Sequence, residues 1–125
     1  MSETADGALG YVEIPAEDLE RAKTFYAAVF GWTYQDTPEG NYSFFDSGEG
    51  GIGGGFMQRG EQSPSHPVTF MICDDLDETL ERIIGNGGTV VSPRMDFGGA
   101  GWLAHITDTE GNLIGLWQGK SAGGA

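Results

Sequence analysis

Cysteine and long apolar runs are both scarce in this sequence. Among 125 residues there is one cysteine, Cys73, which excludes an internal disulfide and paired-cysteine zinc or redox motifs. Apolar runs extend over only a few residues, so we expect no membrane span. Residues 1–7 are acidic and lack an apolar core, so we expect no signal peptide. Together these features predict a cytoplasmic protein.

Basic residues are also few. Six lysines and arginines stand against nineteen acidic residues, which gives a formal net charge of −13 at pH 7. Such a field repels phosphate backbones and anionic lipid headgroups, so we expect neither a nucleic-acid nor a membrane partner. Two explanations of the acid excess stay open: a high-salt cytoplasm that screens the self-repulsion, and an ordinary acidic cytosolic protein.

Apolar and aromatic residues are numerous enough to form a core. They make up 38% and 11% of the chain, and its 13.3 kDa predicts a single domain, which we place at residues 9–118. Residues 1–8 are expected to form an N-terminal tail and residues 119–125 a flexible tail. The 22 glycines are not periodic, which excludes collagen, and they cluster between strand-like runs.

The order of predicted elements repeats once along the chain. Strands are expected at 9–14, where Pro15 ends the run, and at 33–35, 42–46 and 52–58, with a helix from Asp18 to Gly31. The pattern returns at 68–72, 89–91, 102–107 and 112–117, with a helix between Asp75 and Gly87-Gly88. A shift of 57 residues aligns the two halves. We therefore predict an α+β fold of two tandem βαβββ modules, residues 9–60 and 67–118, with mostly antiparallel sheets.

The motifs in this order resemble the vicinal oxygen chelate superfamily, which has the glyoxalase and bleomycin-resistance fold. The carrying segments are residues 13–26, Val29-Phe-Gly-Trp32, 68–75, Asn86-Gly-Gly88 and 108–117. The Glu-Ile-Pro start and the Phe-Gly-Trp end are similar to a large glyoxalase-like subgroup. The resemblance implies a cup of eight strands, with the helices outside and a small-molecule ligand in the concavity.

The resemblance also defines where a metal would bind. Metal-dependent members hold a divalent ion with four side chains on four strands. In this sequence these positions fall on Tyr11, Gly53 or a neighbouring glycine, Val68 and Gly115. Three of the four have no donor atom, and a tyrosine alone does not hold zinc, nickel or iron. We therefore expect no family metal site and no cofactor.

Strand alternation predicts which side chains enter the cup. On the first strand, Tyr11 and Glu13 lie on the face opposite the apolar Val12 and Ile14, which belong beneath the helix. The tight turn at 108–112 pairs His105 with Gly115 across the last two strands, so His105 also enters the cup. Glu13 and His105 are the candidate catalytic residues, as acid and base. The candidate ligand-binding residues are Tyr11, Phe70, Arg94, Leu113 and Trp117, with Arg94 as a clamp for an anionic group. Purely structural roles for Glu13, His105 and Arg94 remain open.

Three functions fit this sequence. The first is a metal-independent, glyoxalase-like protein that binds a small apolar or aromatic metabolite. The second is a metal-independent isomerase, epimerase or hydrolase that uses Glu13 and His105 as acid and base. The third is a lyase or dioxygenase with a displaced metal site that uses His105 and Glu13, with Asp96 as an optional third ligand. Unpaired sheet edges and aromatic residues near the end of the first helix also predict a homodimer.

Overall fold

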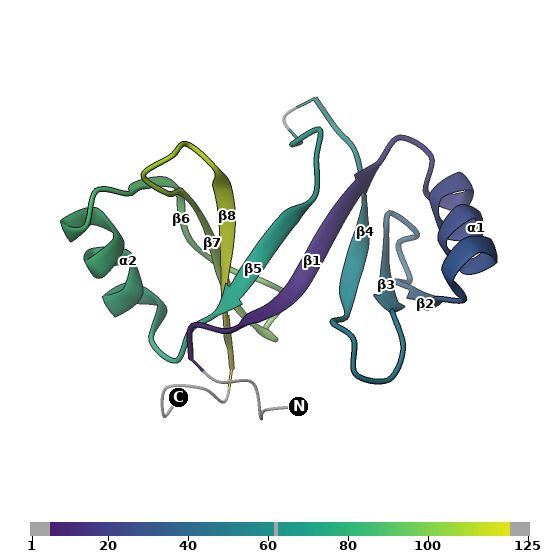
Figure 1. Ribbon diagram of the computed structural model, residues 1–125, viewed down its shortest axis with the longest axis horizontal. Helices are drawn as coiled ribbons and strands as arrows, with labels where there is room; N and C mark the ends of the chain where they lie inside the picture. The colour runs from purple at the N-terminus through teal and green to yellow at the C-terminus, as the bar shows by residue number, and fades with distance from the viewer. Residues whose placement is uncertain (1–5, 62, 121–125) are drawn as a thin grey trace. The chain divides into compact units, whose positions relative to one another are not determined.

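A computed structural model describes residues 6–61 and 63–120 (Figure 1). Two βαβββ series follow each other, which confirms the predicted order of elements. The first series is β1 (Leu9–Ala16), α1 (Leu19–Phe30), β2 (Thr33–Asp36), β3 (Tyr42–Asp46) and β4 (Gly54–Gln58). The second is β5 (Val68–Ile72), α2 (Leu76–Gly85), β6 (Thr89–Asp96), β7 (Gly101–Thr107) and β8 (Leu113–Gly119). Most of the two predicted tails lies outside the described residues.

The chain divides into two compact units. Among the described residues, the first unit comprises residues 11–61 and 63–68, and the second comprises residues 6–10 and 69–120. In the first unit the strand order is β2-β3-β4-β1, with β1 parallel to β4 and the other pairs antiparallel. In the second it is β5-β8-β7-β6, with β5 parallel to β8. Each sheet is therefore mixed, and the fold class is α+β as predicted.

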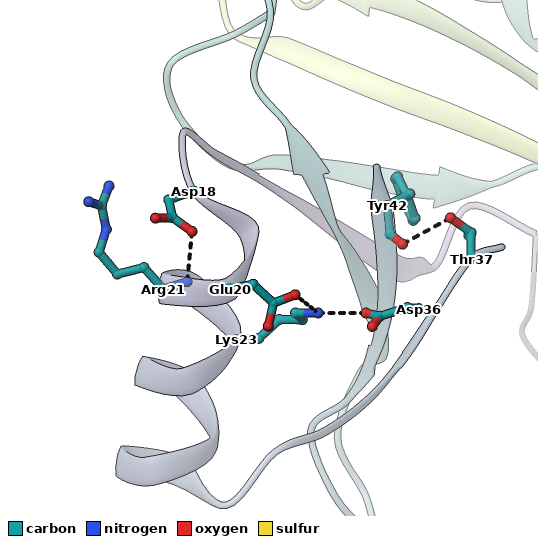
Figure 2. Close-up of polar contacts among 7 residues, drawn as sticks. All are labelled: Asp18, Glu20, Arg21, Lys23, Asp36, Thr37 and Tyr42. Carbon is teal, nitrogen blue, oxygen red and sulfur yellow. Dashed lines mark hydrogen bonds and ion pairs between the residues drawn. The ribbon is translucent and has the colours of Figure 1, made fainter. Parts of the chain in front are cut away.

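Both helices begin at the predicted aspartates. The side chain of Asp18 accepts a hydrogen bond of 3.1 Å from the backbone N–H of Arg21 (Figure 2), and Asp75 caps α2 in the same way. Gly31 ends α1 with φ of 74°, a left-handed conformation that glycine adopts without strain. Helix α2 ends at Gly85 with Asn86 as its C-cap, one residue before the predicted glycine pair. None of the described helices has the length and apolarity needed to cross a membrane.

Helix α1 covers one face of the first unit's sheet. Alternation sends the odd and even residues of β1 to opposite faces, and Val12 and Ile14 pack beneath the helix. Phe56 on β4 is fully buried at the centre, and the Trp32 ring stacks on Phe45 with centroids 4.5 Å apart. The opposite face of this sheet, which we call the helix-free face of the first unit, carries Tyr11 and Glu13.

A buried lysine joins α1 to the edge strand β2. Its ammonium nitrogen lies 2.7 Å from a carboxylate oxygen of Glu20 and 2.7 Å from one of Asp36 (Figure 2), and only 2% of Lys23 is exposed. The Tyr34 ring lies 5.1 Å from the same nitrogen. These charged hydrogen bonds raise the pKa of Lys23 and lower that of Asp36. One of the two lysines of the chain therefore has a structural role in holding β2 against the helix.

Helix α2 covers one face of the second unit's sheet. Its core consists of five buried residues: Cys73, Leu76, Ala104, Ile106 and Leu116. Burial raises the pKa of the Cys73 thiol, which fits the inert role expected from its position. The opposite face, which we call the helix-free face of the second unit, carries His105 and Trp117.

Two strands continue through a proline beyond their predicted ends. β1 extends past Pro15 to Ala16, because Val12 and Ala16 make the hydrogen bonds to the β4 side, so the missing N–H of Pro15 is not required there. β6 extends to Asp96 instead of ending at Val91, because it is the edge strand of its unit and an edge tolerates a proline at position 93.

Candidate functional site

The helix-free face of the first unit carries a chain of hydrogen bonds from two tyrosines to a carboxylate. Tyr42 on β3 donates its hydroxyl proton to Oε2 of Glu13 at 2.9 Å. Tyr42 has only this one hydroxyl proton, so Tyr11 is the donor in the hydrogen bond between the two hydroxyl groups. The structure thus brings the predicted residues Tyr11 and Glu13 together and adds Tyr42 to them.

Local packing fixes the position of Tyr42. Gly55 on β4 lies opposite Glu13, and a Cβ atom at Gly55 would overlap the Tyr42 ring. The glycine therefore leaves the space in which this ring lies across the strand. The Thr37 hydroxyl donates to the Tyr42 carbonyl at 3.1 Å (Figure 2). The Thr37 N–H donates to the same oxygen. These contacts hold the start of β3 so that the phenol reaches Glu13.

Burial controls the ionisation of this cluster. Desolvation raises the pKa of Glu13, and the hydrogen bond from Tyr42 partly offsets it. Burial raises the pKa of Tyr11 to about 12, and the pKa of Tyr42 is raised further by burial and by the carboxylate beside it. Both phenols therefore stay protonated and act as donors near neutral pH. A carboxyl group with a raised pKa is suited to taking up and returning a proton.

The helix-free face of the second unit has a histidine at its centre. His105 on β7 lies opposite Gly115 on β8, which confirms the predicted register. Its Nδ1 lies 3.2 Å from the hydroxyl oxygen of Ser92 on β6, and its ring meets the Phe70 ring edge to face at 5.7 Å. A Cβ atom at Gly115 would overlap Phe70, so this glycine leaves room for the ring beside His105. Burial lowers the pKa of His105, which favours the neutral imidazole at pH 7.

Aromatic and aliphatic side chains surround this histidine. Trp117 lies opposite Leu103, two residues along the β7–β8 ladder from the His105–Gly115 pair, and meets the ring of Phe97 edge to face at 5.9 Å. Leu113 lies at the other end of the same strand, opposite Thr107. Four predicted residues therefore share this face: Phe70, His105, Leu113 and Trp117.

Arg94 lies elsewhere. Its guanidinium forms an ion pair of 2.8 Å with Asp77 of α2 and lies 4.6 Å from the ring centroid of Trp102. Trp102 packs on the α2 side of the sheet. The structure therefore places Arg94 on the helix-covered face of the second unit, apart from His105 and Trp117. A role for it as an anion clamp stays a prediction that this location does not favour.

The residues at the family's metal positions do not fit a divalent ion. The hydroxyl group of Tyr11 is already hydrogen-bonded to that of Tyr42. The side chains of Val68, Gly115 and the glycines at 53–55 have no atom that can ligate a metal. Within residues 6–61 and 63–120, no three His, Cys, Asp or Glu side chains gather in a group that could hold a metal. We therefore derive no chemistry through a metal ion.

The sequence analysis missed two residues of these clusters. Tyr42 was recognised only as part of a strand, because its contact with Glu13 depends on how β3 pairs with β4. Ser92 was outside the predicted strand at 89–91, because the irregular register of β6 on both sides of Ser92 has no clear sequence signal. For Tyr42 a signal did exist: an aromatic residue at a strand start facing a glycine-rich strand indicates a ring packed over glycine.

Comparisons with known proteins agree with the fold. A family model described as Glyoxalase/Bleomycin resistance protein/Dioxygenase superfamily matches residues 8–116. The chain is 34% identical over 131 residues to "Putative glyoxylase CFP32" of Mycobacterium tuberculosis, covering 99% of this chain and 50% of that protein. It is 25% identical over 136 residues to "Anthracycline biosynthesis protein DnrV" of Streptomyces peucetius, covering 94% and 49%. The chain thus spans about half the length of these curated relatives.

Solved structures show the same fold at low sequence identity. The crystal structure of methylmalonyl-CoA epimerase from Mycobacterium tuberculosis matches with a TM-score of 0.71 and 17% identity, covering 95% of this chain and 92% of that one. At this identity the likeness shows the fold alone. Together with the family match, it places this chain in the glyoxalase/bleomycin resistance/dioxygenase superfamily, the family that the motifs resemble.

Proposed function

We propose that the protein binds a small apolar or aromatic metabolite without a metal ion. The observation that carries this proposal is the helix-free face of the second unit, where Phe70, Leu103 and Trp117 surround one neutral histidine. An apolar surface with a few placed polar groups is the usual composition of a small-molecule site. Family membership adds support, because the superfamily description includes bleomycin resistance proteins.

Ligand binding is best tested on Trp117. The other two tryptophans pack on helix-covered faces, so only Trp117 should report a ligand on this face. The named relative from Streptomyces suggests an anthracycline as the first aromatic probe, titrated at about 1 M KCl to screen non-specific attraction to the acidic surface. Tryptophan quenching should saturate, and Trp117→Phe should abolish most of it while Trp102→Phe keeps it.

Native mass spectrometry of the freshly purified protein is a second, independent measurement. It should show a small molecule that co-purifies with the wild type and is lost in Trp117→Ala. A half-buried indole contributes about 1–2 kcal/mol of apolar contact, so binding should weaken roughly 5- to 30-fold. An empty protein that also fails to bind aromatic probes would contradict the proposal.

The metal-free part of the proposal has its own test. Purified untagged protein should contain far less than one equivalent of any divalent metal, and added zinc, nickel or iron should not change its thermal stability. Stoichiometric metal that disappears in His105→Ala would contradict the metal-free proposal.

A second candidate function is acid–base catalysis, as an isomerase, epimerase or hydrolase. The raised pKa of Glu13 and the donors Tyr42 and Tyr11 favour it, since such a carboxyl group can move a proton next to hydrogen-bond donors. Methylmalonyl-CoA in deuterated water is a suitable first substrate because its α-proton is acidic. Exchange that is lost in Glu13→Gln and reduced in Tyr42→Phe would support catalysis, and no exchange above the protein-free rate would exclude it for this substrate.

We also propose a cytoplasmic homodimer. Apolar side chains on the outer surface of α1 support it, because Phe25, Val29 and Phe30 are each more than half exposed. Strand β2 is an exposed edge of its unit, and edges favour pairing with another chain. The −13 charge of each copy opposes association at low salt.

A further inference from the structure

Ser92 and His105 form a polar pair within an otherwise apolar surface. On the helix-free face of the second unit, the imidazole of His105 has Phe70 on one side and the Leu103–Trp117 pair in the next row. Its hydrogen bond to the Ser92 hydroxyl, at 3.2 Å, is made through Nδ1. No charged group contributes to the lowered pKa of His105, which results from burial. The pair is therefore an uncharged polar group among hydrophobic side chains.

The backbone of β6 is shaped around this serine. The register between β6 and β7 shifts on both sides of Ser92, once between Val90 and Ser92 and again between Ser92 and Met95. Such bulges change the direction of a side chain and are enriched next to functional sites. Ser92 is paired with His105 between the two shifts, so the irregular backbone brings its hydroxyl to Nδ1.

We propose that Ser92 fixes the tautomer of His105 and that the Nε2–H of this histidine donates a hydrogen bond to a neutral carbonyl-type oxygen on an aromatic or alicyclic ligand. Ser92 is in this view a positioning residue, and His105 is the residue that contacts the ligand. The inference rests on the proposed ligand-binding function and specifies the ligand's chemical class.

The hydrogen-bond inventory supports this tautomer. The hydroxyl oxygen of Ser92 lies within hydrogen-bond distance of Nδ1 of His105, and we assign the proton of this bond to the hydroxyl group. When that hydroxyl donates, Nδ1 accepts, and a neutral imidazole then carries its proton on Nε2. A neutral donor surrounded by apolar rings favours a neutral acceptor such as a ketone or quinone oxygen, because a carboxylate or phosphate would lose its hydration without gaining an opposite charge.

The tautomer is measurable by nitrogen-15 NMR of the imidazole rings. The protein has only two histidines, and His66 is exposed and serves as the internal reference. We expect the Nε2–H form for His105 and a pKa below the ordinary value of a histidine. In Ser92→Ala the imidazole should populate both tautomers and its pKa should rise, because the neutral form loses its donor. Ser92→Thr should restore both properties, and Thr89→Ala, which removes another hydroxyl from β6, should change neither.

Ligand selectivity is measured with two matched probes. 1-Tetralone and tetralin have the same bicyclic frame, and only tetralone has a carbonyl oxygen. We expect wild type to bind tetralone roughly three- to tenfold more tightly, the range for one net hydrogen bond. The preference should disappear in His105→Phe and Ser92→Ala. It should persist in His105→Gln, whose amide N–H reaches a position similar to Nε2, and in Thr89→Ala.

The outcomes separate this hydrogen-bonding role of His105 and Ser92, which we call the anchor, from the ligand-binding function on which it rests. A His105 ring in the Nδ1–H form, or equal binding of the two probes by wild type, overturns the anchor while ligand binding on this face stands. A wild type that binds neither probe overturns the proposed function, and the anchor with it. A fixed Nε2–H form together with a carbonyl preference that depends on Ser92 supports both.

Discussion

A Cβ atom at Gly115 should destabilise the second unit because the Phe70 ring occupies its place. The ring of Phe70 lies across Gly115, and the added atom would overlap three of its carbons. Phe70 is 4% exposed, so its ring has little space to move. Overpacking of this kind costs about 1–3 kcal/mol, whereas replacing a strand glycine with alanine recovers about 0.5–1 kcal/mol of backbone entropy. The steric cost should exceed the gain in backbone entropy, so Gly115→Ala should lower the free energy of unfolding by about 1–2 kcal/mol.

A smaller side chain at position 70 should relieve this clash. Phe70→Leu alone should cost about 1–2 kcal/mol of packing. In the double variant, leucine leaves room for the new methyl group, so its total cost should be smaller than the sum by about 1 kcal/mol. Urea unfolding of the four proteins, followed by circular dichroism in one buffer, measures this coupling free energy.

Gly119→Ala is the matched control. It lies on the same strand, and an added Cβ atom would meet only Trp117 Nε1, at an ordinary distance of 3.7 Å. This substitution should leave stability unchanged or raise it slightly. Gly115→Ala with wild-type stability, or additive effects of the two substitutions, would refute the argument that the glycine exists to accommodate the ring.

Four further predictions concern charge. Lys23→Met should lower the free energy of unfolding at pH 7, because it removes the partner of the Asp36 carboxylate. Since the folded pKa of Asp36 lies below its ordinary 3.8, the stability difference between wild type and variant, measured by urea unfolding, should shrink as the pH falls below about 4. Glu13→Gln should raise the free energy of unfolding at pH 7, because the raised pKa of Glu13 in the folded state means that its negative charge destabilises the fold. This gain over wild type should vanish as the pH drops to 4.5 and below, where Glu13 is protonated in the folded state. The melting temperature should increase with KCl up to about 1 M, where the screening length is near 3 Å; indifference to salt would contradict repulsion among the acidic groups. Light scattering at two ionic strengths should show a dimer at physiological salt and above, and a 13.3 kDa species at both would exclude it.

The local features of this fold were predictable from sequence because their signals lie within a few residues. Asp18 and Asp75 each precede a run with helical periodicity, and each accepts a hydrogen bond from the backbone N–H three residues later. The turn at 108–112 was also predicted correctly. In the structure Gly111 has φ of 85°, and the Asp108 N–H donates to the Asn112 carbonyl. A correctly read turn fixes the register, which is why His105 was placed opposite Gly115.

The contacts between distant strands were not predictable in the same way. Tyr42 is 29 residues from Glu13, and their hydrogen bond requires the pairings of β3 with β4 and of β4 with β1. Arg94 illustrates the sensitivity to register, because the irregular pairing of β6 decides which sheet face each side chain takes. The sequence left open a clamp for an anionic group and a solvated loop arginine, and in the structure the guanidinium forms an ion pair with Asp77 of α2.

Gly55 and Gly115 explain how the two helix-free faces differ from a metal site. Each glycine lies on the last strand of its βαβββ series, and each is covered by an aromatic ring, Tyr42 in the first unit and Phe70 in the second. From sequence, glycine at these positions indicates the lack of a metal ligand. In the structure, the missing side chain at each glycine leaves the space that the aromatic ring occupies, since a longer side chain there would have to displace that ring. The ring then positions the neighbouring polar group: Tyr42 donates to Glu13, and Phe70 packs against His105. Restoring a ligand at either glycine would therefore remove the contact that now orients the candidate functional residue, so the two arrangements exclude each other within one unit.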